Sequence, residues 1–266
     1  MKILIIGGGN MGLTYAQSFL RSRIVTADNM MVLCRTYEQA NHLSETHEGR
    51  FFSDPRLCVA EADLVIFAVK PQDSPKLFDE IRGLAEPSQV FLSIMAGIRM
   101  EVIARELGVN KIIRAMPNLP AQIGAGVTAF TSTDPVTRIE LVMVQNLLNT
   151  TGKTLYVEKE DRINAATAIS GSGPAYVYYF MNAMIQAARE MGFSDSEAEL
   201  LVAQTFTGAV DLYNKTDLSC EGWIGKVASK GGTTEAALRV FRETALHEDI
   251  VAGARAALLR ARELGS

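Results

Sequence analysis

The chain has 266 residues, of which 48% are hydrophobic and 21% are charged, so it can bury a sizeable core. A chain of this length is expected to form two domains more often than one. Its formal net charge of −4 offers no basic field to a phosphate backbone, which argues against nucleic acid as a partner. The most apolar stretch, residues 175–188, is interrupted by Asn182 and Gln186 and is too short to cross a bilayer, so we expect no membrane insertion.

The few cysteines and histidines predict neither a disulfide framework nor a metal site. Cys34, Cys58 and Cys220 are too far apart for a C-x-x-C motif, which makes a reducing cytoplasm the simplest location. His42 and His47 stand near acidic residues but do not match H-E-x-x-H, and a solvated helix face explains them as well. Because the first residues already match a core strand, we expect no signal peptide.

The start of the chain is its most informative segment. An apolar run at residues 2–6 leads into Gly7-Gly8-Gly9-Asn10-Met11-Gly12, and a helical pattern begins near residue 11. The spacing G-x-G-x-x-G between a strand and a helix is typical of dinucleotide binding: the first glycine turns the chain, the second admits the pyrophosphate and the third lets helix and strand pack closely. We therefore predict that Gly7, Gly9, Asn10, Met11 and Gly12 bind the cofactor at the helix N-terminus. The alternative is a purely structural turn.

The next strand, expected at residues 30–34, ends in Arg35 and Thr36. An acidic residue at this strand end usually binds the ribose 2′-hydroxyl of NAD, whereas arginine suits the 2′-phosphate of NADP. We predict that Arg35 and Thr36 bind the cofactor, with NADP(H) preferred and NAD(H) as the second choice. The alternative is a solvated Arg35 that opens the following helix, with Glu38 competing for its charge.

Apolar runs and helical patterns alternate along the first half of the chain, which predicts a Rossmann-type, doubly wound parallel sheet. The expected strands are 2–6, 30–34, 64–69, 90–94, 111–115 and 126–131, with helices beginning near residues 11, 36, 73, 99 and 135. Ligands of such sheets bind at the carboxyl ends of the strands. We therefore add the strand-end residues Val69, Lys70, Pro71, Ala96 and Asn118 to the predicted cofactor site.

The second half of the chain has a different pattern. After Gly152 and a short segment at 154–158 the strand signals stop, and residues 161–264 are almost entirely helical in pattern. A helix is expected over 174–191, ended by Gly192, and a capping-box pattern at Ser194 opens the next one. We predict a dinucleotide-binding Rossmann domain at 1–152 and an all-α domain at 153–266.

Five segments occur in order over nearly the full chain: the glycine turn, Ala68-Val69-Lys70-Pro71, Arg114-Ala115-Met116-Pro117-Asn118, Ser170-Gly171-Ser172-Gly173-Pro174-Ala175-Tyr176 and Gly231-Gly232-Thr233-Thr234. Together they resemble the pyrroline-5-carboxylate reductase family. The resemblance implies an oxidoreductase that reduces 1-pyrroline-5-carboxylate to L-proline with NAD(P)H, in the last step of proline biosynthesis. It also implies that the C-terminal helices bind substrate and form a homodimer; in this family the dimers often assemble into larger rings.

Reduction of a cyclic imine needs a hydride from the cofactor and a protein that orients the reactants. Such an imine is partly protonated near neutral pH, so no strong general acid is required. Residues 229–234 supply an anion site, because two glycines expose N–H groups before a helix expected to begin at Thr233 or Thr234. We predict that Ser229, Gly232, Thr233 and Thr234 hold the substrate carboxylate and that the Thr234 hydroxyl, the catalytic group, faces the ring nitrogen. For the two threonines the alternative is a plain helix cap.

The resemblance also places Glu160 at the rim of the substrate site, where its charge would favour an iminium; the alternative is a solvated carboxylate. Two positions depart from the family pattern: Leu119 stands where threonine is usual, and Lys230 where proline is usual. Leu119 removes a hydroxyl beside the expected nicotinamide pocket, and Lys230 loosens its loop while adding a cation near the carboxylate site.

Two rival functions fit the same two-domain plan. One is another NADP-linked reductase of imines or hydroxyacids, although the Gly-x-x-x-Asn-x-x-Lys run typical of β-hydroxyacid dehydrogenases is absent from the sequence. The other is a non-catalytic nucleotide sensor whose helical half binds a partner. Turnover of any imine would exclude the nucleotide sensor, and preference for 1-pyrroline-5-carboxylate over its six-membered homologue and over hydroxyacids would exclude the rival reductase.

Overall fold

The computed structural model describes residues 1–264, which form two compact units. The first unit comprises Met1–Ser172 together with the chain from Ala257 onward, and the second comprises Gly173–Ala256. Within residues 1–264, no helix combines the length and the apolar character needed to cross a membrane.

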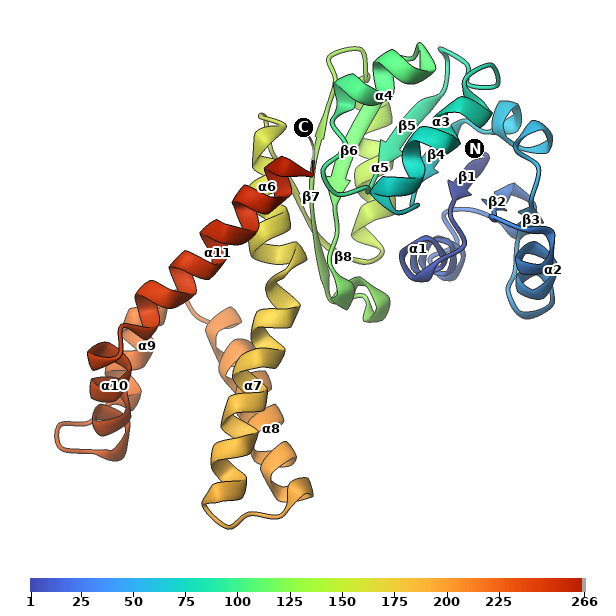
Figure 1. Ribbon diagram of the computed structural model, residues 1–266. Helices are drawn as coiled ribbons and strands as arrows, with labels where there is room; N and C mark the ends of the chain where they lie inside the picture. Colours follow the sequence, from blue (N-terminus) through green and yellow to red (C-terminus); the bar gives the residue numbers. More distant parts are fainter. Residues whose placement is uncertain (265–266) are drawn as a thin grey trace. The chain divides into compact units, whose positions relative to one another are not determined.

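The first unit is built on an eight-stranded sheet with the order β3-β2-β1-β4-β5-β6-β7-β8 (Figure 1). Its strands are β1 (Ile3–Ile6), β2 (Met30–Leu33), β3 (Arg50–Phe52), β4 (Leu64–Phe67), β5 (Val90–Ser93), β6 (Ile112–Met116), β7 (Gly126–Ser132) and β8 (Gly152–Tyr156). The strand order reverses between β1 and β4, which are parallel neighbours. The predicted Rossmann-type sheet is confirmed.

The sheet is not parallel throughout, because β6 and β7 pair in antiparallel fashion. Only residues 117–125 connect these strands, including the short 3-10 helix η5 (Leu119–Ile123). A parallel crossover needs about a dozen or more residues, so this connection only allows β7 to turn back. The expectation of a fully parallel sheet is therefore wrong at this pair, while β7 and β8 are again parallel to each other.

Helices cover both faces of the sheet. They are α1 (Asn10–Arg21), α2 (Tyr37–Thr46), α3 (Ser74–Ile81), α4 (Met100–Leu107) and α5 (Arg138–Asn149). Alternate residues of β1 divide between two buried clusters: Ile3 and Ile5 belong to the cluster that includes side chains of α1, α2 and α5, while Leu4 and Ile6 belong to the one that includes those of α3 and α4. Two buried faces explain why β1, β2 and β4 are apolar without interruption.

The remaining elements of the first unit are short. They are the 3-10 helices η1 (Ala27–Asn29), η2 (Pro55–Leu57), η3 (Val59–Glu61) and η4 (Pro71–Asp73), the helix α6 (Asp161–Ala166) and the π-helical turn η6 (Thr167–Gly171). Strand β3 was not expected from the sequence; it has three residues and only half-buried side chains. Such a strand is too short to give a periodic signal.

The compact units do not coincide with the predicted division between residues 152 and 153. Strand β8 belongs to the first unit because it pairs with β7, and α6 belongs there because it contacts β6 and β7. The end of the chain returns to the same unit, where Arg262 Nη2 donates to Asp161 Oδ2 at 2.8 Å. The assignment of cofactor binding to 1–152 and of substrate binding to 153–266 stays a prediction.

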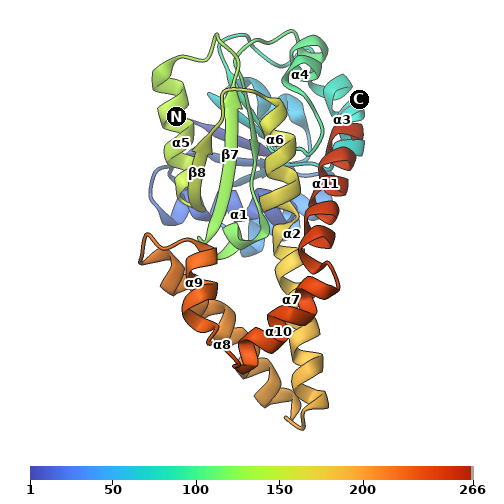
Figure 2. The same cartoon turned by 90° about the vertical axis from the view of Figure 1, so that its left-hand side faces the viewer.

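The second unit is helical, as predicted (Figure 2). It contains α7 (Gly173–Glu190), α8 (Asp195–Asn214), α9 (Cys220–Val227), α10 (Thr233–Glu243) and most of α11 (Leu246–Glu263). Helices α7 and α8 pack against each other. The turn between them contains Gly192 at φ +98°, and the predicted capping box of Ser194 and Glu197 begins α8.

The helices of this unit bury little of their own apolar surface. Helices α7, α9 and α10 have no buried residue, and α8 buries only Ala198 and Val202. Exposed side chains include Val177, Tyr178, Tyr179, Met184, Leu200, Leu201, Val210, Leu212 and Tyr213. Exposed apolar surface of this extent is typical of a protein–protein interface.

Candidate cofactor and active site

The glycine turn has a backbone that only glycine allows at two positions. Gly7 has φ +120°, and a Cβ there would lie 2.7 Å from the carbonyl oxygen of Ala68. A Cβ on Gly12 would lie 2.0 Å from the carbonyl oxygen of Gly7, so the close contact of α1 with the end of β1 requires a missing side chain. The physical roles predicted for these two glycines, a turn and a close helix–strand contact, match this geometry.

The N-terminus of α1 is open for a ligand. A Cβ on Gly9, the N-cap residue, would meet no atom within 4 Å, and no side chain caps the helix. The first N–H groups of a helix have no partner within it, and their dipole favours anions. The turn therefore offers the N–H groups of Asn10, Met11 and Gly12 to a phosphate at the point where the strand order reverses.

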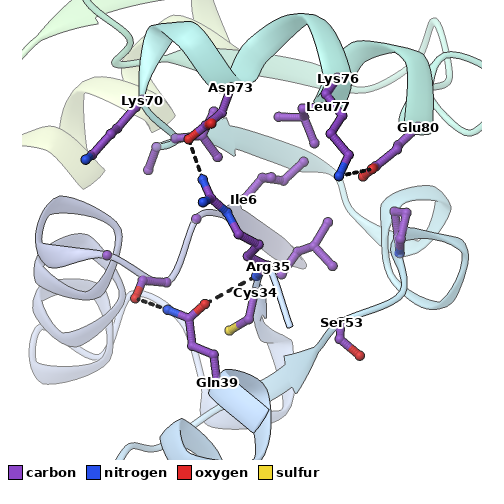
Figure 3. A pocket seen from close by; sticks show the side chains of 17 residues that line it. Ile6, Cys34, Arg35, Gln39, Ser53, Lys70, Asp73, Lys76, Leu77 and Glu80 are labelled. Carbon is purple, nitrogen blue, oxygen red and sulfur yellow. Dashed lines mark hydrogen bonds and ion pairs between the residues drawn. The ribbon is translucent and has the colours of Figure 1, made fainter. Parts of the chain in front are cut away.

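A cavity of about 560 Å³ lies on one side of the turn, at the carboxyl ends of β1, β2 and β4 (Figure 3). Its charged lining residues are Arg35, Lys70, Asp73, Lys76 and Glu80. Arg35 Nη2 forms an ion pair with Asp73 Oδ2, and Lys76 Nζ lies 3.8 Å from Glu80 Oε1. Arg35 is therefore paired with Asp73 and not with Glu38, the competitor expected from the sequence.

One polar residue of α2, Gln39, lines this cavity. Gln39 Nε2 donates to the carbonyl oxygen of Gly8 at 3.0 Å, and its Oε1 accepts from the backbone N–H of Arg35 at 3.3 Å. Thr36 is the N-cap of α2, and its Oγ1 accepts from the backbone N–H of Gln39 at 3.2 Å. Thr36 does not line the cavity, so the geometry does not support its predicted contact with the cofactor. Gln39 was not singled out from the sequence, yet it links Arg35 to the glycine turn.

A second, mainly apolar cavity of about 360 Å³ lies on the other side of Ala68, Val69 and Lys70, which line both cavities. Its other lining residues are Met11, Pro71, Ile94, Met95, Ala96, Met116, Pro117, Asn118, Leu119 and Gly171. All the predicted strand-end residues lie here, together with Met11. Asn118 is held in place because its Oδ1 accepts from the backbone N–H of Val127 at 2.9 Å.

Beside this cavity, a buried ion pair joins β6 to α6. Arg114, only 1% exposed, donates from Nη1 to Glu160 Oε1 at 3.0 Å and from Nη2 to Asn164 Oδ1 at 2.9 Å. The same Glu160 oxygen accepts from the backbone N–H of Met100 at 2.8 Å, and Arg99 Nη2 lies 3.8 Å from Oε2. Burial lowers the pKa of Arg114, and the charge of Glu160 opposes this shift.

Glu160 is therefore not the solvated carboxylate of the alternative interpretation, because its side chain is only 14% exposed and is paired. The pair fixes α6 to the sheet, and α6 leads directly into the π-helical turn whose last residue, Gly171, lines the second cavity. π-helical turns of this kind are frequent at functional sites. The role of Glu160 toward a substrate stays a prediction.

The predicted anion site of the second unit differs from the expected form, because the N–H groups of Gly231 and Gly232 are not free but are hydrogen-bonded within the loop. Helix α10 begins at Thr233, as predicted, and Gly232 is its N-cap, with no side-chain cap. Neither threonine caps the helix, so the plain-cap alternative is wrong. Gly231 has φ +74° and its N–H donates to Glu235 Oε2 at 2.6 Å, while Gly232 N–H donates to the carbonyl oxygen of Ser229 at 3.0 Å.

No group of three or more histidine, cysteine, aspartate or glutamate residues within 1–264 has the arrangement needed to hold a metal ion. The two cavities with their glycine turn, and the loop before α10, are candidate functional sites.

Comparisons with known proteins identify the family. Residues 160–264 match the family model for pyrroline-5-carboxylate reductase dimerisation, and residues 2–97 match the model for NADP oxidoreductase, coenzyme F420-dependent. The chain is 33% identical to pyrroline-5-carboxylate reductase 2 of Bacillus subtilis over 252 residues, which cover 94% of this chain and 90% of that protein.

Solved structures agree in sequence and shape. A pyrroline-5-carboxylate reductase from Coxiella burnetii has 31% identity and a TM-score of 0.90, covering 100% of this chain and 98% of the other. Pyrroline carboxylate reductase from Plasmodium falciparum, solved with NADP bound, has 25% identity and a TM-score of 0.90 at the same coverage. The chain belongs to the pyrroline-5-carboxylate reductase family.

Proposed function

We propose that this protein reduces 1-pyrroline-5-carboxylate to L-proline with NADPH, the last step of proline biosynthesis. The observation that carries the proposal is the pair of cavities that meet at Ala68, Val69 and Lys70 on either side of the glycine turn, in a chain of this family. One cavity has charged side chains and the other is mainly apolar, which suits the two ends of a dinucleotide.

The residues of the glycine turn fit the phosphates of NADP(H). The open backbone at Gly9 and the uncapped N-terminus of α1 would bind the pyrophosphate. Arg35 and Lys70 in the larger cavity would favour the 2′-phosphate, which supports NADPH over NADH. The cofactor, when bound, supplies the hydride, and the apolar lining around Met11 and Ala96 would keep water away from the nicotinamide.

The substrate carboxylate would bind the loop before α10. The N–H groups of Thr233 and Thr234 lie at the uncapped N-terminus of that helix, where the dipole favours an anion, and Ser229 would add its hydroxyl. The Gly232 N–H, predicted to join them, already donates to the carbonyl oxygen of Ser229. In this proposal the Thr234 hydroxyl donates to or accepts from the ring nitrogen, and Lys230 adds positive charge nearby. Glu160 would act through Oε2, since Oε1 already accepts two hydrogen bonds.

A homodimer formed through the C-terminal helices accounts for the apolar surface that α7 and α8 leave exposed. The match of residues 160–264 to a dimerisation model supports the same assignment. Assembly of dimers into a larger ring, and a cytoplasmic location, remain proposals drawn from the family resemblance and from the scattered cysteines.

One assay tests the activity against its rivals. NADPH absorbance is followed with 1-pyrroline-5-carboxylate, then with its six-membered homologue, and finally in reverse with hydroxyacids and NADP. The proposal expects rapid oxidation of NADPH with the five-membered imine. Preference for another imine or for a hydroxyacid would support the rival reductase, and tight NADPH binding without turnover of any substrate would support the nucleotide sensor.

A matched pair of variants tests the substrate loop. Thr234→Val removes the proposed hydroxyl contact to a charged substrate, worth roughly 1–3 kcal/mol, so kcat/KM should fall by about five- to two-hundred-fold. Thr233→Val keeps the backbone N–H and loses a hydroxyl to which no contact is assigned, so its effect should be much smaller. Wild-type kcat/KM in a stably folded Thr234→Val protein would remove Thr234 from the mechanism.

A further inference from the structure

We propose that Asp73 is a specificity-determining residue that moderates the preference for NADPH, because its carboxylate competes with the cofactor 2′-phosphate for the Arg35 guanidinium. The inference rests on the proposed use of NADP(H). It concerns a residue outside the glycine turn and outside the substrate loop.

The ion pair crosses the larger cavity. Arg35 follows β2, Asp73 is the last residue of η4 after β4, and β1 with the glycine turn lies between these strands. Figure 3 shows the Arg35 side chain reaching up to Asp73 from the opposite wall. The Arg35 backbone is fixed by Gln39, so the side chain is the part that can turn toward a ligand.

The pair is easily opened. The side chain of Arg35 is 73% exposed and that of Asp73 is 36% exposed, and ion pairs in such exposed positions contribute little to stability. A phosphate bound to the same guanidinium can therefore displace the carboxylate, with a charge-assisted, bidentate contact.

The displaced carboxylate still affects the ligand. A carboxylate within reach of a guanidinium lies only a few ångströms from any phosphate on the same group, and the two anions repel. A ribose 2′-hydroxyl is neutral and can donate a hydrogen bond to the carboxylate. Asp73 therefore weakens the binding of a 2′-phosphate and leaves the binding of a 2′-hydroxyl unchanged or improves it. The difference in affinity between NADPH and NADH becomes smaller as a result.

The test uses fragments that differ only in the 2′-phosphate. Adenosine 2′,5′-bisphosphate and 5′-AMP are titrated into the full-length protein by calorimetry, for the wild type and for Asp73→Asn. The bisphosphate should bind the variant about three- to tenfold more tightly, from the ion pair and the repulsion together, and the Kd of 5′-AMP should change less than about twofold or weaken. In turnover, the KM for NADPH should fall relative to that for NADH.

Two further variants identify the cause. Glu80→Gln removes the same charge from the same cavity but at Lys76, so its effect on the bisphosphate should be smaller than that of Asp73→Asn. In an Arg35→Ala background, Asp73→Asn should give a smaller gain than in the wild type, because the competition for Arg35 is gone.

Three outcomes would overturn the inference. The first is that Asp73→Asn binds the bisphosphate and 5′-AMP more tightly by the same factor, and the second is that it binds the bisphosphate more weakly than the wild type does. The third is that Asp73→Asn increases the affinity for the bisphosphate as much in the Arg35→Ala background as in the wild type. Failure of the underlying function is distinguishable, because the wild type would then bind the bisphosphate no better than 5′-AMP. Thermal unfolding without nucleotide verifies that each variant is folded.

Discussion

Replacement of Glu160 by glutamine should destabilise the first unit strongly. The change leaves Arg114, which is 1% exposed, as a buried cation without its carboxylate partner at 3.0 Å. Loss of one member of a buried pair costs about 3–5 kcal/mol, and the lower end applies here because the amide oxygen still accepts a hydrogen bond. At about 2–4 °C per kcal/mol for a protein of this size, Tm should fall by roughly 6–12 °C.

Thermal unfolding followed by circular dichroism measures this shift, with Glu158→Gln as the matched control. Glu158 is exposed, two residues away, and its replacement should move Tm by less than about 1 °C, as surface changes do. The double variant Arg114→Met with Glu160→Met should recover part of the loss, because no buried charge remains, although Asn164 Oδ1 and the Met100 N–H lose their partners. A Tm of Glu160→Gln within 2 °C of wild type would show that the pair does not hold α6 to the sheet, and the reasoning would fail (about 2 °C corresponds to less than 1 kcal/mol).

Three other changes have definite expected outcomes. Gly12→Ala should abolish NADPH binding and lower Tm, because its Cβ would lie 2.0 Å from the Gly7 carbonyl oxygen; normal binding of NADPH by calorimetry would contradict the close contact. Arg35→Ala should raise the KM for NADPH much more than that for NADH, and equal increases would remove Arg35 from the 2′-phosphate site. Burial raises the pKa of Tyr15 to about 12, from 10.0, and its hydroxyl lies near Thr128 and Thr151 without a well-aligned hydrogen bond. The stability that this neutral phenol provides is complete below pH 10.0 and is lost as the pH rises through about 12. Between these pH values the free energy of unfolding, measured by denaturant titration, should therefore fall less for Tyr15→Phe than for the wild type. An identical fall in the two proteins would refute the role of Tyr15.

Much of the first unit could be predicted from the sequence because its signals are local. The apolar runs of β1, β2, β4 and β5 and the glycines between β1 and α1 each act within a few residues. The antiparallel turn of β7 depends instead on the length of one connection, and the boundary of the first unit depends on pairing of β8 and on the return of α11. Such non-local constraints give no periodic pattern.

Contacts between the residues of the site were also hard to predict, because they join segments far apart in the sequence. Arg35 was found because its position after β2 has a known meaning, but its partner Asp73 is 38 residues away and meets it only when β2 and β4 flank β1. Glu160 was expected at the rim of the substrate site, with a solvated carboxylate as the alternative. Its burial against Arg114 follows from packing of α6 on β6, 46 residues earlier in the chain. Gln39 and Gly171 acquire their positions in the same way, from contacts across the sheet edge and from a π-helical turn.

A structure of the full-length protein with NADPH bound tests the central claim most directly. The account predicts the pyrophosphate at the N–H groups of Asn10, Met11 and Gly12, the 2′-phosphate at Arg35, and the nicotinamide in the cavity lined by Ala96 and Asn118. An empty glycine turn, or a nicotinamide ring bound outside that cavity, would contradict it.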